Sequence, residues 1–501
     1  AQTATPGGAS PSLPLDLTAA PAETAFPPVV IPTHQPLTNV PVPTSTPPPA
    51  GAFVEPTYTA TFDTAPILYY AQSGDSLLAI AKRFNVTEDE ITTTGSIPET
   101  GLIDPGTLLI IPDRISEPTT PYIEIMPDNE IIFSATSVDF NVEEFIVNAG
   151  GRLSTFREYL GSTGWVDGHE AISRLAIENS INPRVLLGIL EYESRWVTGE
   201  PVDIMHTDYP MGYQDYHYKG MFIQLVWGIN QLSNAYYGWR AGTLTHLEFP
   251  DGTSLRLDPR LNAGTVAIQY LFSRLHSQSQ WAQIINPDTG FPTMYSLMFG
   301  DPWSRADLVN PIFPPGLVQP EMAFPFDRNV RWSYTGGPHG AWEHEGALAA
   351  VDFAPATEHG GCEETPTWIL SASAGLVVRS ERGVVVVDMD NDGYEQTGWS
   401  LLYLHVATKD RVKVGTWLEI GDRIGHASCE GGVSTGTHLH FARKYNGEWI
   451  AADGAMPFVL SGWRAVNGAK PYEGKLVRGD ETIIADPVGQ KWSNIVKDPE
   501  E

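Results

Sequence analysis

Composition changes abruptly near residue 65, and this change limits where the chain can form a folded core. The first 60 residues contain 14 of the 41 prolines and no Lys or Arg. Such a stretch, filled out mainly by Thr, Ala and Ser, buries too little apolar surface to offset the entropy lost on ordering. Residues 1–64 are therefore predicted to form an extended, disordered Pro/Thr/Ala-rich linker. The 501-residue length leaves room for about three domains in all.

The charge balance narrows the classes of partner. Sixty Asp and Glu against 30 Lys and Arg give a net charge of −30, which excludes nucleic acid as the main partner because phosphate binding needs a basic surface. No apolar run approaches the roughly 18 residues that a transmembrane helix needs. The chain starts at Ala1 without an export signal. Removal of such a signal would explain this start, and so would an arbitrary chain boundary.

Residues 66–113 are predicted to form a small β-α-α-β unit. Tyr69–Gln72 is a short strand, and the turn at 73–76 also caps a helix in which apolar residues recur at helical spacing over 77–84. A second short helix follows with Thr87 as its cap. The unit closes with a turn and the strand 108–112.

This unit resembles a LysM module over its whole length. The resemblance is carried by Gln72-Ser73-Gly74-Asp75-Ser76-Leu77 at the start and by Pro105-Gly106-Thr107-Leu108 at the end. It implies binding to glycans that contain N-acetylglucosamine, such as peptidoglycan and chitin. The stretch 92–95 has Thr where the family commonly has Asn. A small αβ spacer that binds no glycan is the alternative.

Residues 120–310 are predicted to be mostly helical. Asn182-Pro183 starts a helix that is apolar nearly all round, and 263–275 forms another. The stretch 185–194 resembles the catalytic helix of lysozyme-like lytic transglycosylases, which implies that Glu193 is a general acid/base. Glu191 lies about 200° away around the helix and cannot face the same cleft. The alternative is an ordinary glutamate in a glycan-binding relative without activity.

Residues 320–490 are predicted to be rich in antiparallel strands, and histidines concentrate there. Seven of the 13 histidines lie between His339 and His440. We expect a turn at 336–339, a strand at 350–355, a strand that ends at 403–405, and two histidines on one strand face within 435–441. Two histidines and one carboxylate that leave the fourth tetrahedral position open form the catalytic type of zinc site.

This region resembles the lysostaphin-type (LytM-like) zinc endopeptidases, which cut the peptide cross-bridges of peptidoglycan. The resemblance covers residues 334–452 and is carried by His438-Leu439-His440 with the preceding Ser434-Thr435-Gly436. Residue by residue, it implies that zinc is bound by His339, Asp352 and His440. It also implies that His438 and His405 act beside the metal as general base and transition-state stabiliser.

The first metal-binding motif departs from the family pattern His-x-x-x-Asp. His339 precedes Asp352 by 13 positions and His344 precedes it by 8. We favour His339, because Gly-Gly-Pro-His is typical of a rigid turn, and His344 remains the alternative. His359 and His426 are interpreted as bystanders in turns.

Two further features of this region are structural predictions. Cys362 and Cys429 are expected to form a disulfide if the protein is exported. The acidic stretch 388–393 imitates the start of a calcium loop, but Trp399 stands where such a loop needs its bidentate Glu. An acidic hairpin turn is the favoured interpretation.

Together these features predict a multidomain α+β protein: a disordered stalk, a LysM module, a lysozyme-like helical domain and a β-rich zinc peptidase domain. The predicted function is that of a secreted peptidoglycan hydrolase of the bacterial cell envelope that depends on Zn²⁺. Glu193 would add a possible second activity on the glycan strands. The alternative is a non-catalytic envelope protein that binds wall glycan and activates another hydrolase.

Overall fold

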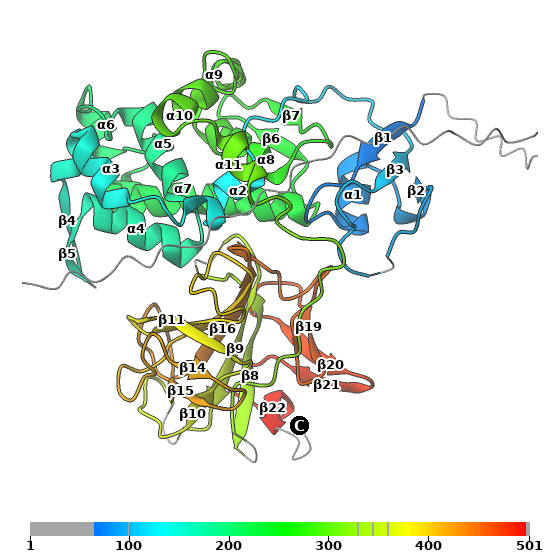
Figure 1. Cartoon of the computed structure of the whole chain (residues 1–501), viewed down its shortest axis with the longest axis vertical. Helices are drawn as coiled ribbons and strands as arrows, with labels where there is room; N and C mark the ends of the chain where they lie inside the picture. Colours follow the sequence, from blue (N-terminus) through cyan, green and yellow to red (C-terminus); the bar gives the residue numbers. More distant parts are fainter. Residues whose placement is uncertain are drawn as a thin grey trace, which may run out of the picture. The chain divides into compact units, whose positions relative to one another are not determined.

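The computed structural model describes residues 65–98, 100–161, 163–327, 330–342, 345–357 and 360–496 (Figure 1). The predicted linker 1–64, the alternative ligand His344 and the bystander His359 lie outside the described residues. All described residues belong to one compact unit. None of the helices in the described part of the chain combines the length and the hydrophobicity that a bilayer span requires.

The N-terminal module has the predicted strand–helix–helix–strand order. Its elements are β1 (Ile67–Tyr70), α1 (Leu77–Phe84), the 3₁₀ helix η1 (Glu88–Glu90), β2 (Thr92–Thr93) and β3 (Leu108–Ile111). Ser76 caps α1, and the Glu90 carboxylate accepts the backbone N–H of Thr87 at 2.9 Å. The short strand β2 was not predicted, and it completes an antiparallel sheet of order β1-β3-β2.

The middle region is mainly helical, with two small hairpins. Its helices and strands are α2 (Asp128–Ile131), η2 (Ala135–Ser137), α3 (Val142–Ala149), η3 (Arg152–Thr155), β4 (Arg157–Leu160), β5 (Gly164–Asp167), α4 (Gly168–Asn179), α5 (Pro183–Ser194), α6 (Ile204–Asp208), η4 (Tyr216–Tyr218), α7 (Met221–Arg240), β6 (His246–Glu248), β7 (Ser254–Arg256), α8 (Ala263–Leu275), α9 (Gln278–Ile284), α10 (Phe291–Phe299) and α11 (Pro302–Asp307). Helix α5 begins as predicted, with Asn182 as its cap and Pro183 in the first turn. Helix α8 has the predicted limits, and its apolar residues are buried in one core with those of α5 and α7.

The C-terminal region is built from antiparallel strands. They are β8 (Arg331–His339), β9 (Ala350–Pro355), β10 (Trp368–Leu370), β11 (Gly375–Glu381), β12 (Val384–Asp388), β13 (Trp399–Leu404), β14 (Trp417–Leu418), β15 (Arg423–His426), β16 (Leu439–Tyr445), β17 (Glu448–Trp449), β18 (Val459–Leu460), β19 (Trp463–Asn467), β20 (Gly474–Arg478), β21 (Glu481–Ile484) and β22 (Asn494–Val496), with the 3₁₀ helix η5 (Lys491–Ser493) before the last strand. The main sheet has the order β14-β11-β12-β13-β16-β9-β8-β22, and β17 pairs with β16. Strands β18–β21 form a second sheet.

The structure corrects one predicted turn. Gly336–His339 is the end of strand β8 and not a turn. The pairing of β8 with β9 shifts register between Tyr334 and Gly336 and again between Gly336 and His339. These irregularities explain why a Gly-Gly-Pro sequence fits here. A bulged strand tolerates glycine and does not need the backbone N–H that proline lacks, whereas a regular hydrogen-bonded ladder needs it.

The other two structural predictions for this region agree with the structure. Cys362 and Cys429 form a disulfide with a Cα–Cα distance of 5.6 Å. The acidic stretch lies in the connection between the antiparallel strands β12 and β13. There the buried carboxylate of Asp388 accepts the backbone N–H groups of Asp390 and Gly393, so it stabilises the turn.

Candidate metal centre

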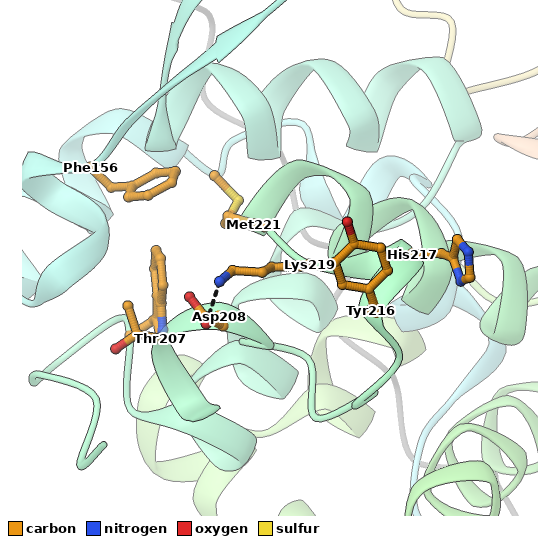
Figure 2. Close-up of a pocket in the computed structure, with 9 residues that line it drawn as sticks. Phe156, Thr207, Asp208, Tyr216, His217, Lys219 and Met221 are labelled. Carbon is orange, nitrogen blue, oxygen red and sulfur yellow. Dashed lines mark ion pairs between the residues drawn. The ribbon is translucent and has the colours of Figure 1, made fainter. Parts of the chain in front are cut away.

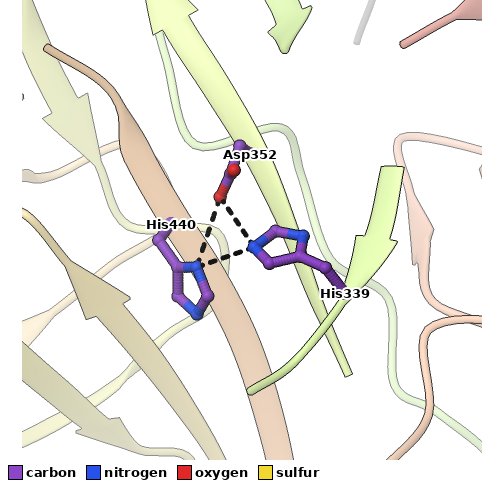
Figure 3. Close-up of side chains that lie close together, drawn as sticks. All are labelled: His339, Asp352 and His440. Carbon is purple, nitrogen blue, oxygen red and sulfur yellow. Dashed lines mark hydrogen bonds and ion pairs between the residues drawn. The ribbon is translucent and has the colours of Figure 1, made fainter. Parts of the chain in front are cut away.

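Three adjacent strands bring His339, Asp352 and His440 together. Strand β9 lies between β8 and β16 in the main sheet, and its Asp352 pairs with His440 on one side and with Gly336 on the other. His339 reaches the same point from the bulged end of β8 (Figure 3). Residues separated by up to 101 positions in the sequence thus become neighbours through strand order.

The side-chain atoms of these residues converge closely. The His339 Nε2 atom lies 3.0 Å from His440 Nδ1. Asp352 Oδ1 lies 3.2 Å from the first nitrogen and 3.3 Å from the second. All three side chains are buried, and Asp352 Oδ1 has no hydrogen-bond partner of good geometry. A buried, unsatisfied carboxylate oxygen facing two imidazole nitrogens is the arrangement that a divalent metal would satisfy.

The outer nitrogen of each ligand ring is hydrogen-bonded to the backbone. His339 Nδ1 donates to the carbonyl of Gly337 at 2.8 Å, and His440 Nε2 donates to the carbonyl of Ala341 at 2.9 Å. Because a carbonyl can only accept, the proton of each neutral ring sits on this outer nitrogen. The inner nitrogen therefore carries the lone pair that a metal ligand needs.

Electrostatics at the centre favour the ionised carboxylate. Burial disfavours the charge on Asp352, but His339 and His440 overcome this effect and hold the pKa of its carboxyl well below the usual range. Burial lowers the pKa of His440 and keeps its ring neutral. Asp352 outweighs burial at His339 and raises the pKa of that ring. An ionised carboxylate beside a neutral imidazole is the protonation state in which these side chains bind metal.

Two further histidines flank this group. His405 follows β13 with a positive φ of 65°, and its Nδ1 donates to the Glu430 carbonyl at 2.8 Å. His438 precedes β16, and its Nδ1 donates to the Gly436 carbonyl at 2.8 Å. The two ring centroids are 4.4 Å apart, and His438 Nε2 lies 3.8 Å from Asp352 Oδ1. Burial, with the nearby His438 and His440, lowers the pKa of His405 to about 3.

One aromatic residue at the site was missed by the sequence analysis. Tyr472 lies between β19 and β20, and its ring stacks on that of His339. Its carbonyl accepts the Gly337 N–H at 2.8 Å. Tyr472 belongs to no sequence motif, so only its contacts with His339 and Gly337 in the folded protein identify it as part of the site. His426 was predicted to lie in a turn, but it is the last residue of strand β15, which pairs with β10. There it contacts the Thr367 carbonyl and the Trp368 ring.

Glu193 lies in the last turn of α5. Its Oε1 atom lies 2.9 Å from His276 Nε2. Glu191 turns away to accept the backbone N–H groups of Val197 and Thr198, so the two glutamates do not share a cleft. The acid/base role of Glu193 stays a prediction.

Three segments of the chain match known families. Residues 69–112 match the LysM domain, residues 124–312 match the N-terminal domain of LasA, and residues 357–452 match peptidase family M23. His405, His438 and His440 lie inside the last match, whereas His339 and Asp352 precede it.

Similar proteins include curated peptidases. Protease LasA from Pseudomonas aeruginosa (strain UCBPP-PA14) is 27% identical over 301 residues, which cover 55% of this chain and 66% of the relative. Beta-lytic metalloendopeptidase from Lysobacter enzymogenes is 25% identical over 161 residues, covering 32% of this chain and 85% of the relative. The chain thus spans just under two thirds of the LasA relative.

Solved structures with a similar chain include an M23 metalloprotease described as pseudoalterin from the deep sea. It has a TM-score of 0.28 and 21% identity, and the match covers 34% of this chain and 96% of that one. The lysostaphin catalytic domain from Staphylococcus simulans has a TM-score of 0.18 and 24% identity, covering 25% and 90%. By the family matches, the chain contains a LysM domain, a domain of the LasA N-terminal type and a domain of peptidase family M23.

Proposed function

We propose that this protein is a secreted, zinc-dependent endopeptidase that cuts the peptide cross-bridges of peptidoglycan. The observation that carries the proposal is the close approach of His339 and His440 to the unsatisfied Oδ1 oxygen of Asp352. His405 and His438 lie beside this group. The M23 and LysM matches support the same conclusion.

His339, Asp352 and His440 would hold the zinc ion. Bound zinc supplies Lewis acidity, which polarises a peptide carbonyl and makes water a better nucleophile. Three protein ligands suit this role because they leave a position open for substrate and water. The hydrogen bonds from the outer ring nitrogens to Gly337 and Ala341 keep both imidazoles oriented before substrate arrives.

His438 and His405 would move the protons. Each ring donates from Nδ1 to a backbone carbonyl, which leaves Nε2 free to accept a proton. His438 Nε2, 3.8 Å from Asp352 Oδ1, would act as general base for an attacking water. His405, whose pKa is about 3, is neutral with its proton on Nδ1, so its Nε2 lone pair would stabilise the transition state by accepting a hydrogen bond.

The LysM domain would hold the enzyme on its substrate. A net charge of −30 is repelled by acidic wall polymers, so electrostatics alone would keep the protein away from the wall. Glycan binding by the LysM domain would offset this repulsion and raise the local concentration of cleavable peptide bonds.

The test is zinc content followed by wall digestion. Wild-type protein should contain one zinc ion per chain and release new amino termini from purified peptidoglycan. His440→Ala should lose both properties. The matched control is His426→Ala, which removes a histidine outside the metal centre and should retain both. Folded wild-type protein that binds no added zinc would refute the proposal and favour the non-catalytic glycan-binding activator.

Cleavage of the glycan strand by Glu193 is a separate proposal, which rests on the place of Glu193 at the buried end of α5. It receives less support, because the carboxylate is engaged by His276 at 2.9 Å. If this activity exists, wall digests should contain anhydro-muropeptides that disappear in Glu193→Gln and persist in His440→Ala. Digests without such products would exclude it.

A further inference from the structure

The helical region contains a pocket of about 590 Å³ that the metal chemistry does not use. Its lining residues come from the connection between η3 and β4, from the residues just after α5, from helix α6, from the 3₁₀ helix η4 and from the start of α7. Figure 2 shows their side chains around the pocket. A volume in this range suits a small molecule or a short segment of a polymer. Glu193 is not among the residues that line the pocket.

One wall of the pocket is aromatic and rigid. The partly exposed Phe156 ring is the accessible part of this wall, and it packs edge-to-face on the Trp196 ring with centroids 4.9 Å apart. Trp196 and Met221 are each 1% exposed and support Phe156 from behind. Trp196 Nε1 donates to the His206 carbonyl at 2.9 Å, which fixes the indole. This wall can receive an apolar group without rearrangement, so little entropy is lost on binding.

The polar part of the pocket is an ion pair. Lys219 Nζ lies 2.7 Å from Asp208 Oδ2, and the two side chains are 53% and 23% exposed (Figure 2). Because the pair is neutral overall, a charged ligand gains little net attraction from it. A hydroxyl-rich neutral ligand can donate to the carboxylate and accept from the ammonium while the pair stays intact.

The rim of the pocket carries an exposed aromatic ring. Tyr216 is 81% exposed, more than any other tyrosine in the part of the chain that the structure describes. It lies on η4, where the Asp215 carboxylate caps the helix by accepting the His217 N–H at 2.8 Å. This ring lies at the pocket rim with its faces open to solvent, so it is available to stack on a ligand that enters the pocket.

We infer that this pocket binds a neutral, N-acetylated sugar chain, the same class of polymer that the LysM domain would bring to the protein. A pyranose ring has an apolar face for Tyr216, hydroxyls for the Asp208–Lys219 pair and an acetamido methyl for the accessible Phe156 ring. The choice of glycan rests on the proposed function, in which the chain works on the cell wall. The helical domain then holds the glycan strand while the metal centre cuts the peptide attached to it.

The lining of the pocket indicates binding and not cleavage. Glycosidases of the common type need a pair of carboxylates on either side of the scissile bond. Asp208 is the only carboxylate residue that lines the pocket, and Lys219 neutralises it. A carboxylate held in an ion pair is a poor proton donor, so the pocket lacks both members of the pair.

The test uses a fluorescent reporter at the pocket rim of the full chain. Cys362 and Cys429 are bridged, so Gln214→Cys introduces a single reactive thiol at an exposed position two residues before Tyr216. With an environment-sensitive dye on this thiol, tetra-N-acetylchitotetraose should change the emission saturably. Tyr216→Ala in the labelled chain should weaken the apparent affinity by about tenfold or more, because the stacking surface is lost.

The matched control is Tyr159→Ala in the same labelled chain. Tyr159 is 63% exposed but does not line the pocket, so its removal should leave the response unchanged. No saturable response, or an equal response in Tyr216→Ala, would overturn the inference. The reporter needs neither zinc nor hydrolysis, so its result is independent of the assays that test the endopeptidase.

Discussion

The ring of Tyr472 stacks on the ring of His339, with centroids 4.0 Å apart and an interplanar angle of 21°. The connection between β19 and β20 that carries Tyr472 lies outside the segment that matches peptidase family M23. The backbone carbonyl of Tyr472 also accepts the N–H of Gly337 at 2.8 Å, and Gly337 lies two residues before His339. The connection between two strands of the second sheet therefore supports His339, the proposed metal ligand, through both ring and backbone.

Removing this ring should weaken zinc binding. Tyr472→Ala removes the ring packed on His339 and leaves its orientation to the hydrogen bond with Gly337 alone, and loss of an outer-shell support costs about 10–100-fold in metal affinity. Competition with a chromogenic chelator measures the change. Tyr472→Phe keeps the stacked ring and should bind zinc as the wild type does. Equal affinity for Tyr472→Ala and wild type would show that the stack does not position His339.

The flanking histidines should be needed for hydrolysis and not for metal binding. His438→Ala removes the proposed general base and His405→Ala removes the proposed transition-state stabiliser, and each loss should cost about 10²–10⁴-fold in kcat. Zinc content measured on the same samples should stay at the wild-type level. Loss of zinc from either variant would instead make that histidine a ligand.

A side chain at Gly336 should disrupt the metal centre. A Cβ atom there would lie 2.5 Å from Asp352 Oδ2, so Gly336→Ala must displace the carboxylate. We expect a folded protein with strongly reduced zinc content. Gly95→Ala is the control, since its Cβ would meet no atom closer than 4.0 Å. Full zinc occupancy in Gly336→Ala would mean that Asp352 is not a required ligand.

The disulfide should stabilise the fold around the site. Cys362 and Cys429 are separated by 67 positions, and closing a loop of this length in the unfolded chain is worth about 4 kcal/mol in the chain-entropy description. Urea unfolding of the double variant Cys362→Ser, Cys429→Ser should show a loss of this order. The same loss should appear in wild-type protein unfolded under reducing conditions. An unchanged midpoint in both experiments would argue against a stabilising bridge.

A buried charge cluster should make stability depend on acid pH. Burial opposes the charge on Glu395, but Arg379 and Lys444 lower the pKa of this carboxyl from 4.5 to about 2. A carboxyl whose pKa is depressed by folding stabilises the protein above its unfolded pKa. That contribution is lost as pH falls from about 4.5 through about 2. Urea midpoints across this range should therefore decline.

Glu395→Gln tests the assignment of this decline. The variant leaves two buried cations without their carboxylate, so it should be destabilised at neutral pH by about 3–5 kcal/mol. Its urea midpoint should also fall much less than that of the wild type between pH 4.5 and 2. The exposed Glu381→Gln should behave as wild type. A decline of wild-type size in Glu395→Gln would assign it to other carboxyls.

Local structure followed closely from the sequence wherever one signal dominated. Asn182-Pro183 combines a side-chain cap with a preset backbone angle, and α5 begins there. The limits of α8 and β9 also agree with the predicted ranges. The end of β8 was predicted wrongly as a turn, because Gly-Gly-Pro favours turns in isolation and pairing with β9 outweighs that preference.

The sequence by itself determined the helical and strand-rich regions and the types of ligand, because periodicity, caps and short motifs act between residues close along the chain. Only the tertiary structure decided which groups meet. Strand order places β9 between β8 and β16, so Asp352 lies beside His339 and His440, and a second sheet adds Tyr472. Such contacts depend on strand pairing and register between residues far apart in sequence, which no local pattern encodes.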